Sequence, residues 1–196
     1  KATQRLPSLL VIDLWSGIGG LCVALLSLGV HFYALAAENS EECIQSVQSC
    51  MPQVVHVKKV ENVTASLLVK LAGRRKLDGI LLGGGSPCQG NTSLNNKAGG
   101  LKDTRSLQPS HLARLRNEIR AEAALAGLHV YVFLENAGSS PLDVIQQCNS
   151  WLGGSVFYGE SGRCGWARWW RSYWAEGPRG SFATASKPTL PLDWEM

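Results

Sequence analysis

The sequence predicts an α/β fold in which helices cover both faces of a mostly parallel β-sheet. Short apolar runs alternate with longer amphipathic stretches along most of the chain, the order expected when helices connect parallel strands. A glycine-rich turn closes the first apolar run. The chain has 196 residues, of which 45% are hydrophobic and 17% charged. This composition suits one globular domain with a full core.

Each expected strand is a short apolar run bounded by turn residues. These runs are residues 9–15, 30–37, 54–57, 78–82, 130–134 and 156–158. The expected helices lie between them, at residues 20–28, 40–51, 65–74, 110–126 and 142–151. Ser40 can cap a helix that begins with two glutamates, and Pro141 suits a first helical turn. We expect residues 1–180 to form the domain and residues 181–196, with their prolines and small residues, to form a tail or linker.

The charge and the cysteines limit the classes of partner and metal site. The net charge of +4 permits a polyanionic partner without requiring one. The six cysteines are scattered, and no two have CxxC spacing, so we expect reduced thiols and no zinc. No apolar run reaches the roughly 18 residues of a membrane helix, and the N-terminus lacks the apolar core of a signal peptide. We therefore expect an intracellular protein without a membrane segment.

The turn after the first expected strand has the features of a nucleotide-cofactor site. It reads Asp13-Leu14-Trp15-Ser16-Gly17-Ile18-Gly19-Gly20 and precedes an expected helix. In this context glycines let the backbone approach a ligand closely. A dinucleotide GxGxxG pattern would need glycine at Cys22. A tight turn without a ligand is the alternative interpretation.

Glu38 ends the second expected strand, about 20 residues after the glycine turn. An acidic side chain at this place can accept hydrogen bonds from ribose hydroxyls. Both NAD and S-adenosyl-L-methionine carry such hydroxyls. An NAD-dependent oxidoreductase is disfavoured, because Cys22 interrupts the GxGxxG pattern and no set of residues for hydride transfer is recognisable. A solvated surface glutamate is the alternative.

A cysteine-containing segment follows the fourth expected strand. It reads Gly83-Gly84-Gly85-Ser86-Pro87-Cys88-Gln89-Gly90. Ligands of open parallel sheets bind at the carboxyl ends of the strands, so we expect the Cys88 thiol beside the cofactor. A structural cysteine more often lies within a strand or helix, and a loop position favours a reactive thiol. Residues 83–109 are longer than an ordinary connection, which indicates a functional loop.

Several motifs in this order resemble those of the cytosine-5 DNA methyltransferases. GGGSPCQGNTS around Cys88 resembles the family's Pro-Cys motif, and DLWSGIGGL resembles its first motif. Residues 37–39 are similar to the second motif, and residues 133–137, FLENA, to the Glu-Asn-Val motif. Residues 168–174, RWWRSYW, are similar to the arginine motif, most of all in de novo-type enzymes. Together the motifs cover most of residues 9–174.

The resemblance implies a Rossmann-like S-adenosylmethionine-dependent methyltransferase fold and covalent catalysis. Cys88 would add to carbon 6 of cytosine so that carbon 5 accepts a methyl group. Glu135 would protonate nitrogen 3, and Asn136 would orient the loop. Arg171, with Arg168 as the alternate, would contact the carbonyl oxygen of the base. The residues implied for S-adenosylmethionine are Asp13, Trp15, Ser16, Gly17, Gly19, Glu38, Asn39, Val60 and Pro87.

The implied substrate is a cytosine flipped out of DNA, at a cost of a few kcal/mol. Lys97, Lys102 and Arg105, in the loop after Cys88, would hold phosphates. Ordinary solvated loop charges are the alternative for all three. In a eukaryote the resemblance implies a nuclear location.

Two positions depart from the family pattern within these motifs. Lys59 stands where many relatives carry an acid that binds the adenine amino group, and Glu61 could replace that acid only with a shifted turn. The family's two arginines are separated by one residue, whereas two tryptophans separate Arg168 from Arg171. In a strand, odd spacing places the two arginines on opposite faces, so one alone would face the base.

The family normally continues into a target-recognition region and two closing motifs, whereas residues 175–196 alone follow Trp174. We therefore expect either a fragment or a reduced member that relies on a homologous or accessory subunit for target recognition. The main alternative function is a catalytically silent regulatory or DNA-binding relative. Joint retention of Cys88, Glu135 and Arg171 favours the enzyme.

Overall fold

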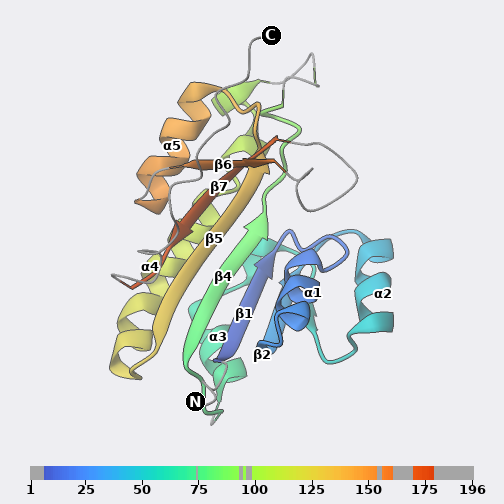
Figure 1. Ribbon diagram of the computed structural model, residues 1–196, viewed down its shortest axis with the longest axis vertical. Coiled ribbons are helices and arrows are strands. Elements are labelled where there is room, and N and C mark those ends of the chain that lie inside the picture. Colours follow the sequence, from blue (N-terminus) through green and yellow to red (C-terminus); the bar gives the residue numbers. More distant parts are fainter. Residues whose placement is uncertain are drawn as a thin grey trace.

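The computed structural model describes residues 7–73, 75–92, 95, 99–153, 156–160 and 170–178. They form a seven-stranded sheet in the order β3-β2-β1-β4-β5-β7-β6 (Figure 1). The strands are β1 (Ser8–Leu14), β2 (His31–Ala37), β3 (Val55–Val57), β4 (Gly79–Gly85), β5 (His129–Ala137), β6 (Phe157–Glu160) and β7 (Trp170–Glu176). The α-helices are α1 (Gly20–Ser27), α2 (Glu41–Cys50), α3 (Ala65–Ala72), α4 (Ser110–Leu125) and α5 (Leu142–Leu152). Three 3₁₀ turns are η1 (Val60–Asn62), η2 (Gly100–Lys102) and η3 (Thr104–Leu107).

The sheet is mostly parallel, which confirms the predicted fold class. Strands β1 to β5 pair in parallel, whereas β7 runs antiparallel to both β5 and β6. Strand β7 was not predicted from the sequence, although its residues alternate between half-buried and buried positions. Arg171 and Tyr173 face one side of the sheet, and buried Ser172 and Trp174 face the other. The insertion of β7 between β5 and β6 therefore places Arg171 next to the end of β5.

Two apolar layers cover the two faces of the sheet. On β1, Leu10, Ile12 and Leu14 pack with α3, α4 and α5, whereas Leu9 and Val11 pack with α1 and α2. This alternation follows from the two-residue period of a strand. The helices on both faces confirm the prediction, and Figure 1 shows α3, α4 and α5 behind the sheet. The packed core thereby fixes the positions of the strand ends on which the site is built.

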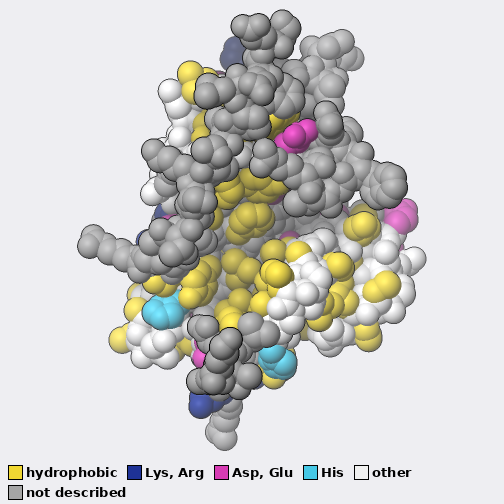
Figure 2. Space-filling model, in the orientation of Figure 1, with side chains coloured by type: hydrophobic (Ala, Val, Ile, Leu, Met, Phe, Trp, Pro, Cys, Tyr) yellow, Lys and Arg dark blue, Asp and Glu magenta, His cyan; other side chains and the backbone are white. Residues whose placement is uncertain are grey.

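Part of the sheet face beside α1 bears aromatic side chains. The ring of Tyr173 stacks on Phe133 and on Phe157, with centroids 5.8 and 5.4 Å apart. Figure 2 shows hydrophobic side chains gathered on this face over β4, β5 and α1. These stacked rings join β5, β7 and β6 across the antiparallel edge and help fix the position of β7.

The loop predicted to begin at residue 83 begins later. Gly83, Gly84 and Gly85 continue β4 and pair with residues 133–135 of β5. A Cβ atom on Gly84 would lie 1.9 Å from the carbonyl oxygen of Leu14, so glycine permits the close approach of β1 and β4. The loop also contains the η2 and η3 turns. Ser40 caps α2 as predicted, whereas Pro141 lies at the N-cap of α5, one position before the predicted first turn.

Some predictions fall outside the described residues, among them those for Lys97, Arg168, Cys164 and the tail at residues 181–196. In the part of the chain that is described, none of the helices combines the length and apolar character needed to cross a bilayer.

Candidate functional site

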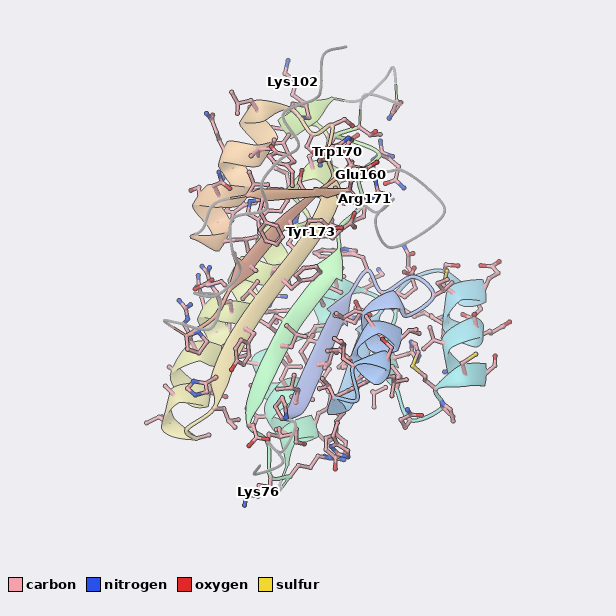
Figure 3. The ribbon with its side chains drawn as sticks, in the orientation of Figure 1. Lys76, Lys102, Glu160, Trp170, Arg171 and Tyr173 are labelled. Atoms are coloured by element: carbon pink, nitrogen blue, oxygen red, sulfur yellow. The ribbon has the colours of Figure 1, made fainter. Side chains whose placement is uncertain are left out.

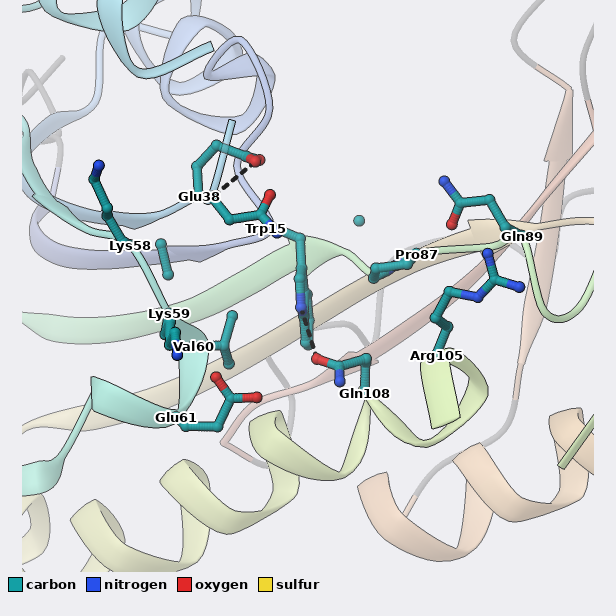
Figure 4. Close-up of a pocket in the computed structure, with 13 residues that line it drawn as sticks. Trp15, Glu38, Lys58, Lys59, Val60, Glu61, Pro87, Gln89, Arg105 and Gln108 are labelled. Carbon is teal, nitrogen blue, oxygen red and sulfur yellow. Dashed lines mark hydrogen bonds between the residues drawn. The ribbon is translucent and has the colours of Figure 1, made fainter. Parts of the chain in front are cut away.

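A cavity of about 610 Å³ opens at the carboxyl ends of β1 to β4. This is the edge of an open parallel sheet at which ligands bind. We call it the edge pocket (Figure 4). Its lining residues are Trp15, Ala37, Glu38, Asn39, Lys58, Lys59, Val60, Glu61, Gly85, Pro87, Gln89, Arg105 and Gln108. Among the predicted cofactor residues, Trp15, Glu38, Asn39, Val60 and Pro87 line it.

The glycine turn lies beside the edge pocket, which Trp15 alone of the turn residues lines. Gly17 and Gly19 have left-handed φ angles of 52° and 82°, a conformation that glycine adopts without strain. A Cβ atom on Gly17 would meet nothing within 4 Å, so the backbone of the turn borders open space. Trp15 shares the left-handed conformation, at φ 56°, and its ring is a wall of the pocket.

Asp13 and Ser16 place unpartnered polar atoms beneath this turn. Both residues are buried, and neither Asp13 Oδ2 nor Ser16 Oγ has a hydrogen-bond partner among the described residues. Burial, and then the charge of Glu38, raises the pKa of Asp13 to about 7. A buried polar atom without a partner is costly. Neither residue lines the edge pocket, and a polar ligand group or a water molecule could satisfy these atoms.

Glu38 is held by backbone donors rather than solvated. Its Oε2 accepts from the backbone N–H of Gly17 at 2.8 Å, and its Oε1 accepts from those of Asn39 and Ser40 at 2.8 and 2.9 Å. The side chain thereby joins the glycine turn to the end of β2. Each carboxylate oxygen retains acceptor capacity for a ligand hydroxyl.

The η1 turn after β3 forms the other end of the pocket. Lys58, Lys59, Val60 and Glu61 all line it, and Figure 4 shows the Glu61 carboxylate directed into the pocket beside Val60. Glu61 Oε1 lies 3.7 Å from Nε2 of His111 in α4. Burial is the main cause that lowers the pKa of His111, and the Glu61 charge opposes it. An acid is thus present at this end, although Lys59 occupies the position predicted for one.

The cysteine loop, residues 86–92, is held to β5 by a buried amide. Asn136 Nδ2 donates to Ser86 Oγ at 2.6 Å, and its Oδ1 accepts from the N–H of Ala137 at 2.7 Å. The carbonyl oxygen of Cys88 accepts from the backbone N–H groups of the third and fourth residues after it. Cys88 itself is half-buried. The neighbouring side chains Pro87 and Gln89 line the edge pocket.

Glu135 and Arg171 form an ion pair beside this loop. Arg171 Nε lies 2.6 Å from Glu135 Oε1, and Glu135 is the direct β-sheet partner of Gly85, the last residue of β4. Burial raises the pKa of Glu135, and the charge of Arg171 opposes this rise. A carboxyl group that burial favours in its protonated form can donate a proton.

Of the predicted phosphate contacts, the described residues Lys102 and Arg105 lie at the same end of the sheet as Arg171. Figure 3 shows Lys102 at this end and Lys76 at the opposite end. Arg105 lines the edge pocket, but its guanidinium pairs with Asp103 at 2.6 Å. Gln108, whose side chain accepts a hydrogen bond from Trp15, was not predicted as a site residue. Sequence patterns carry no signal for that contact, because 93 positions separate the two residues.

The sheet order, the glycine turn and the placement of the pocket define a Rossmann-like methyltransferase fold. No protein-family model matches the chain, and no curated protein matches it. Solved structures do match. A DNA modification methyltransferase encoded within an E. coli prophage has 22% sequence identity and a TM-score of 0.62, over 86% of this chain and 46% of that one.

Two further structures show the same fold. The methyltransferase EhMeth of Entamoeba histolytica has 18% identity and a TM-score of 0.57, over 88% of this chain and 53% of that one. The Dnmt2 methyltransferase of S. pombe has 15% identity and a TM-score of 0.54, over 87% and 49%. The chain therefore spans about half the length of each matched structure. The resemblance predicted from the motifs is confirmed at the level of the fold.

Proposed function

We propose that this chain is the cofactor-binding and catalytic part of a DNA cytosine-5 methyltransferase. The observation that carries the proposal is the convergence of three distant motifs at one sheet edge. Asn136 bonds the cysteine loop, Glu135 faces the end of β4, and Arg171 pairs with Glu135. The fold shared with DNA methyltransferases supports it.

The edge pocket fits S-adenosylmethionine. The unpartnered Asp13 and Ser16 atoms suit the polar amino-acid end of the molecule, beside the open backbone of Gly17. Glu38 and Asn39 would hold the ribose, with Trp15, Val60 and Pro87 against the apolar parts. When bound, S-adenosylmethionine supplies the methyl group.

Adenine recognition is assigned to the η1 end of the pocket. The ends of β1, β2 and β3 follow one another along the sheet edge, so a ligand with its ribose at Glu38 would place its base near residues 58–61. The Glu61 carboxylate is directed into this space and can accept from an exocyclic amino group. We therefore propose that Glu61 performs the task for which Lys59 is unsuited.

The catalytic side chains would act on a flipped cytosine. The Cys88 sulfur would form a bond to carbon 6 while Glu135 donates a proton to nitrogen 3, which leaves carbon 5 electron-rich. Arg171 would hold Glu135 in place and contact the carbonyl oxygen of the base. After methylation, loss of the carbon 5 proton to a base and departure of the Cys88 thiolate would restore the aromatic ring, and return of the nitrogen 3 proton to Glu135 would leave the neutral base.

DNA would approach the sheet edge that bears Cys88. Lys102 is exposed there and can contact phosphates. Arg105 would do so only by sharing its guanidinium with Asp103. Target recognition is assigned to a homologous or accessory subunit, or to further chain, because the matched structures are about twice as long as the matched part.

A covalent trap tests the proposal. DNA that contains 5-fluorocytosine should form a denaturation-resistant adduct with the wild-type chain when S-adenosylmethionine is present. Fluorine replaces the proton that must leave carbon 5 before the Cys88 thiolate can depart, so the covalent bond to Cys88 persists. Cys88→Ala should abolish the adduct. Cys50→Ala is the matched control, because Cys50 is an exposed free thiol at the end of α2. An adduct that survives Cys88→Ala would exclude this nucleophile. S-adenosylhomocysteine binding without any adduct would indicate a catalytically silent relative.

A further inference from the structure

Trp15 combines a strained backbone with a directed hydrogen bond. It is the one non-glycine residue with a positive φ in the described part of the chain, and a bulky side chain is rarely found there. Its indole Nε1 donates to Gln108 Oε1 at 3.2 Å across the edge pocket (Figure 4). Such outliers persist where the surroundings hold them, and they concentrate at ligand sites.

Gln108 in turn is joined to the cysteine loop. It is the C-cap of η3, in which the buried Ser106 donates its hydroxyl hydrogen to Asn91 Oδ1. The backbone N–H of Gly100 donates a hydrogen bond to the carbonyl oxygen of Gly90 at 3.0 Å. A Cβ atom on Gly90 would lie 2.6 Å from Ser106 Oγ, so the two segments are packed without space between them.

The contacts continue to the cysteine. The N–H groups of Asn91 and Thr92 donate to the carbonyl oxygen of Cys88 at 2.8 and 2.9 Å. A continuous path thus leads from the Trp15 ring by a hydrogen bond to Gln108, along the chain to Ser106, and by a second hydrogen bond to Asn91 in the turn that carries Cys88. Each step is a hydrogen bond or a short stretch of chain, so displacement of one member is transmitted to the next.

We propose that Gln108 is a positioning residue, whose bond to Trp15 couples the cysteine loop to occupation of the edge pocket. A ligand against the ring restrains Trp15 and keeps its N–H directed at Gln108. This restraint steadies η3 and, through Ser106 and Asn91, the turn at Cys88. A phenylalanine ring could cover the same ligand but has no donor, so the coupling requires tryptophan. The identity of the ligand and the role of Cys88 rest on the proposed function.

Hydrogen exchange of the ligand-free chain tests the bond itself. Trp15→Phe removes the donor and Gln108→Leu removes the acceptor. Each should accelerate exchange of amides in residues 88–92 and 99–107 about fivefold, the equivalent of about 1 kcal/mol for one net hydrogen bond. The double variant should exchange no faster than either single variant. Gln108→Glu keeps an acceptor oxygen and should restore the wild-type rate.

Wild-type exchange in either single variant, or additive acceleration in the double variant, would overturn the proposal. Gln146→Leu is the matched control, because it makes the same change on the exposed face of α5. It should leave exchange at these amides unchanged.

The coupling is tested with S-adenosylhomocysteine at saturation, with binding followed by calorimetry. The ligand should slow the same amides about fivefold in the wild type and in Gln108→Glu, and less than about twofold in Trp15→Phe and Gln108→Leu. Equal slowing in all four would overturn the coupling. Absence of binding heat with the wild type would contradict the proposed cofactor instead, and the ligand-free exchange rates would still decide whether Gln108 holds the loop.

Discussion

Asp13 should make the chain less stable as the pH rises, and Asp13→Asn should remove this dependence. The side chain is buried at the end of β1 with one oxygen unpartnered among the described residues. Burial, with the charge of Glu38, raises its pKa from 3.8 to about 7. Below pH 3.8 both the folded and the unfolded chain carry the proton. Between about pH 4 and pH 7 the folded chain keeps a proton that the unfolded chain has lost, so the free energy of unfolding falls.

The magnitude follows from the size of the pKa change. One pKa unit corresponds to about 1.4 kcal/mol. The rise from 3.8 to about 7 therefore costs on the order of 4 kcal/mol of stability once Asp13 is ionised. Between pH 5 and pH 8 the change is about 3 kcal/mol, because part of the cost is already present at pH 5. This is a large share of the stability of a typical domain.

Urea denaturation of the wild type and of Asp13→Asn at pH 5 and pH 8 measures this cost. All other titrating groups are common to the two proteins, so the difference between their pH dependences isolates Asp13. The variant should gain about 3 kcal/mol relative to the wild type on going from pH 5 to pH 8. Parallel loss of stability in both proteins would refute the inference that Asp13 is buried with a raised pKa.

Three further substitutions test other contacts. Asn136→Ala removes the anchor of Ser86 within a buried site and should cost about 1 to 3 kcal/mol, measured by urea denaturation. Cys88 alkylation should accelerate in the same variant. Glu61→Leu should weaken S-adenosylhomocysteine binding about tenfold in calorimetry, but leave binding of the inosine analogue, which lacks the amino group, nearly unchanged. An equal loss for both ligands would contradict the adenine contact. Arg116→Met removes one of the two arginines that pair with the half-buried Glu176 and leaves two carbonyl oxygens at the end of α5 without their donor. It should lower the free energy of unfolding by about 1 to 3 kcal/mol, and an unchanged denaturation midpoint would contradict this role of Arg116.

Local patterns were sufficient for most of the elements. The predicted helices and the six predicted strands all appear, with shifts of no more than three residues at their ends. Periodicity and turn residues act within a few positions of the chain, and they largely decide which segments become helices or strands. The antiparallel strand β7 was missed because its mixed polar and aromatic residues gain their apolar contacts only beside β5 and β6.

The sequence alone determined the fold class, the glycine turn and the meeting at one sheet edge of the motif residues that follow β1, β2, β4 and β5, because all parallel strands present their carboxyl ends on the same side. The tertiary structure decided the rest. It paired Trp15 with Gln108, turned Glu61 into the edge pocket and joined Glu135 to Arg171. These contacts join residues that are distant in the sequence, and burial sets the pKa values of Asp13 and Glu135. Distance and burial depend on how the elements pack, which a local pattern does not encode.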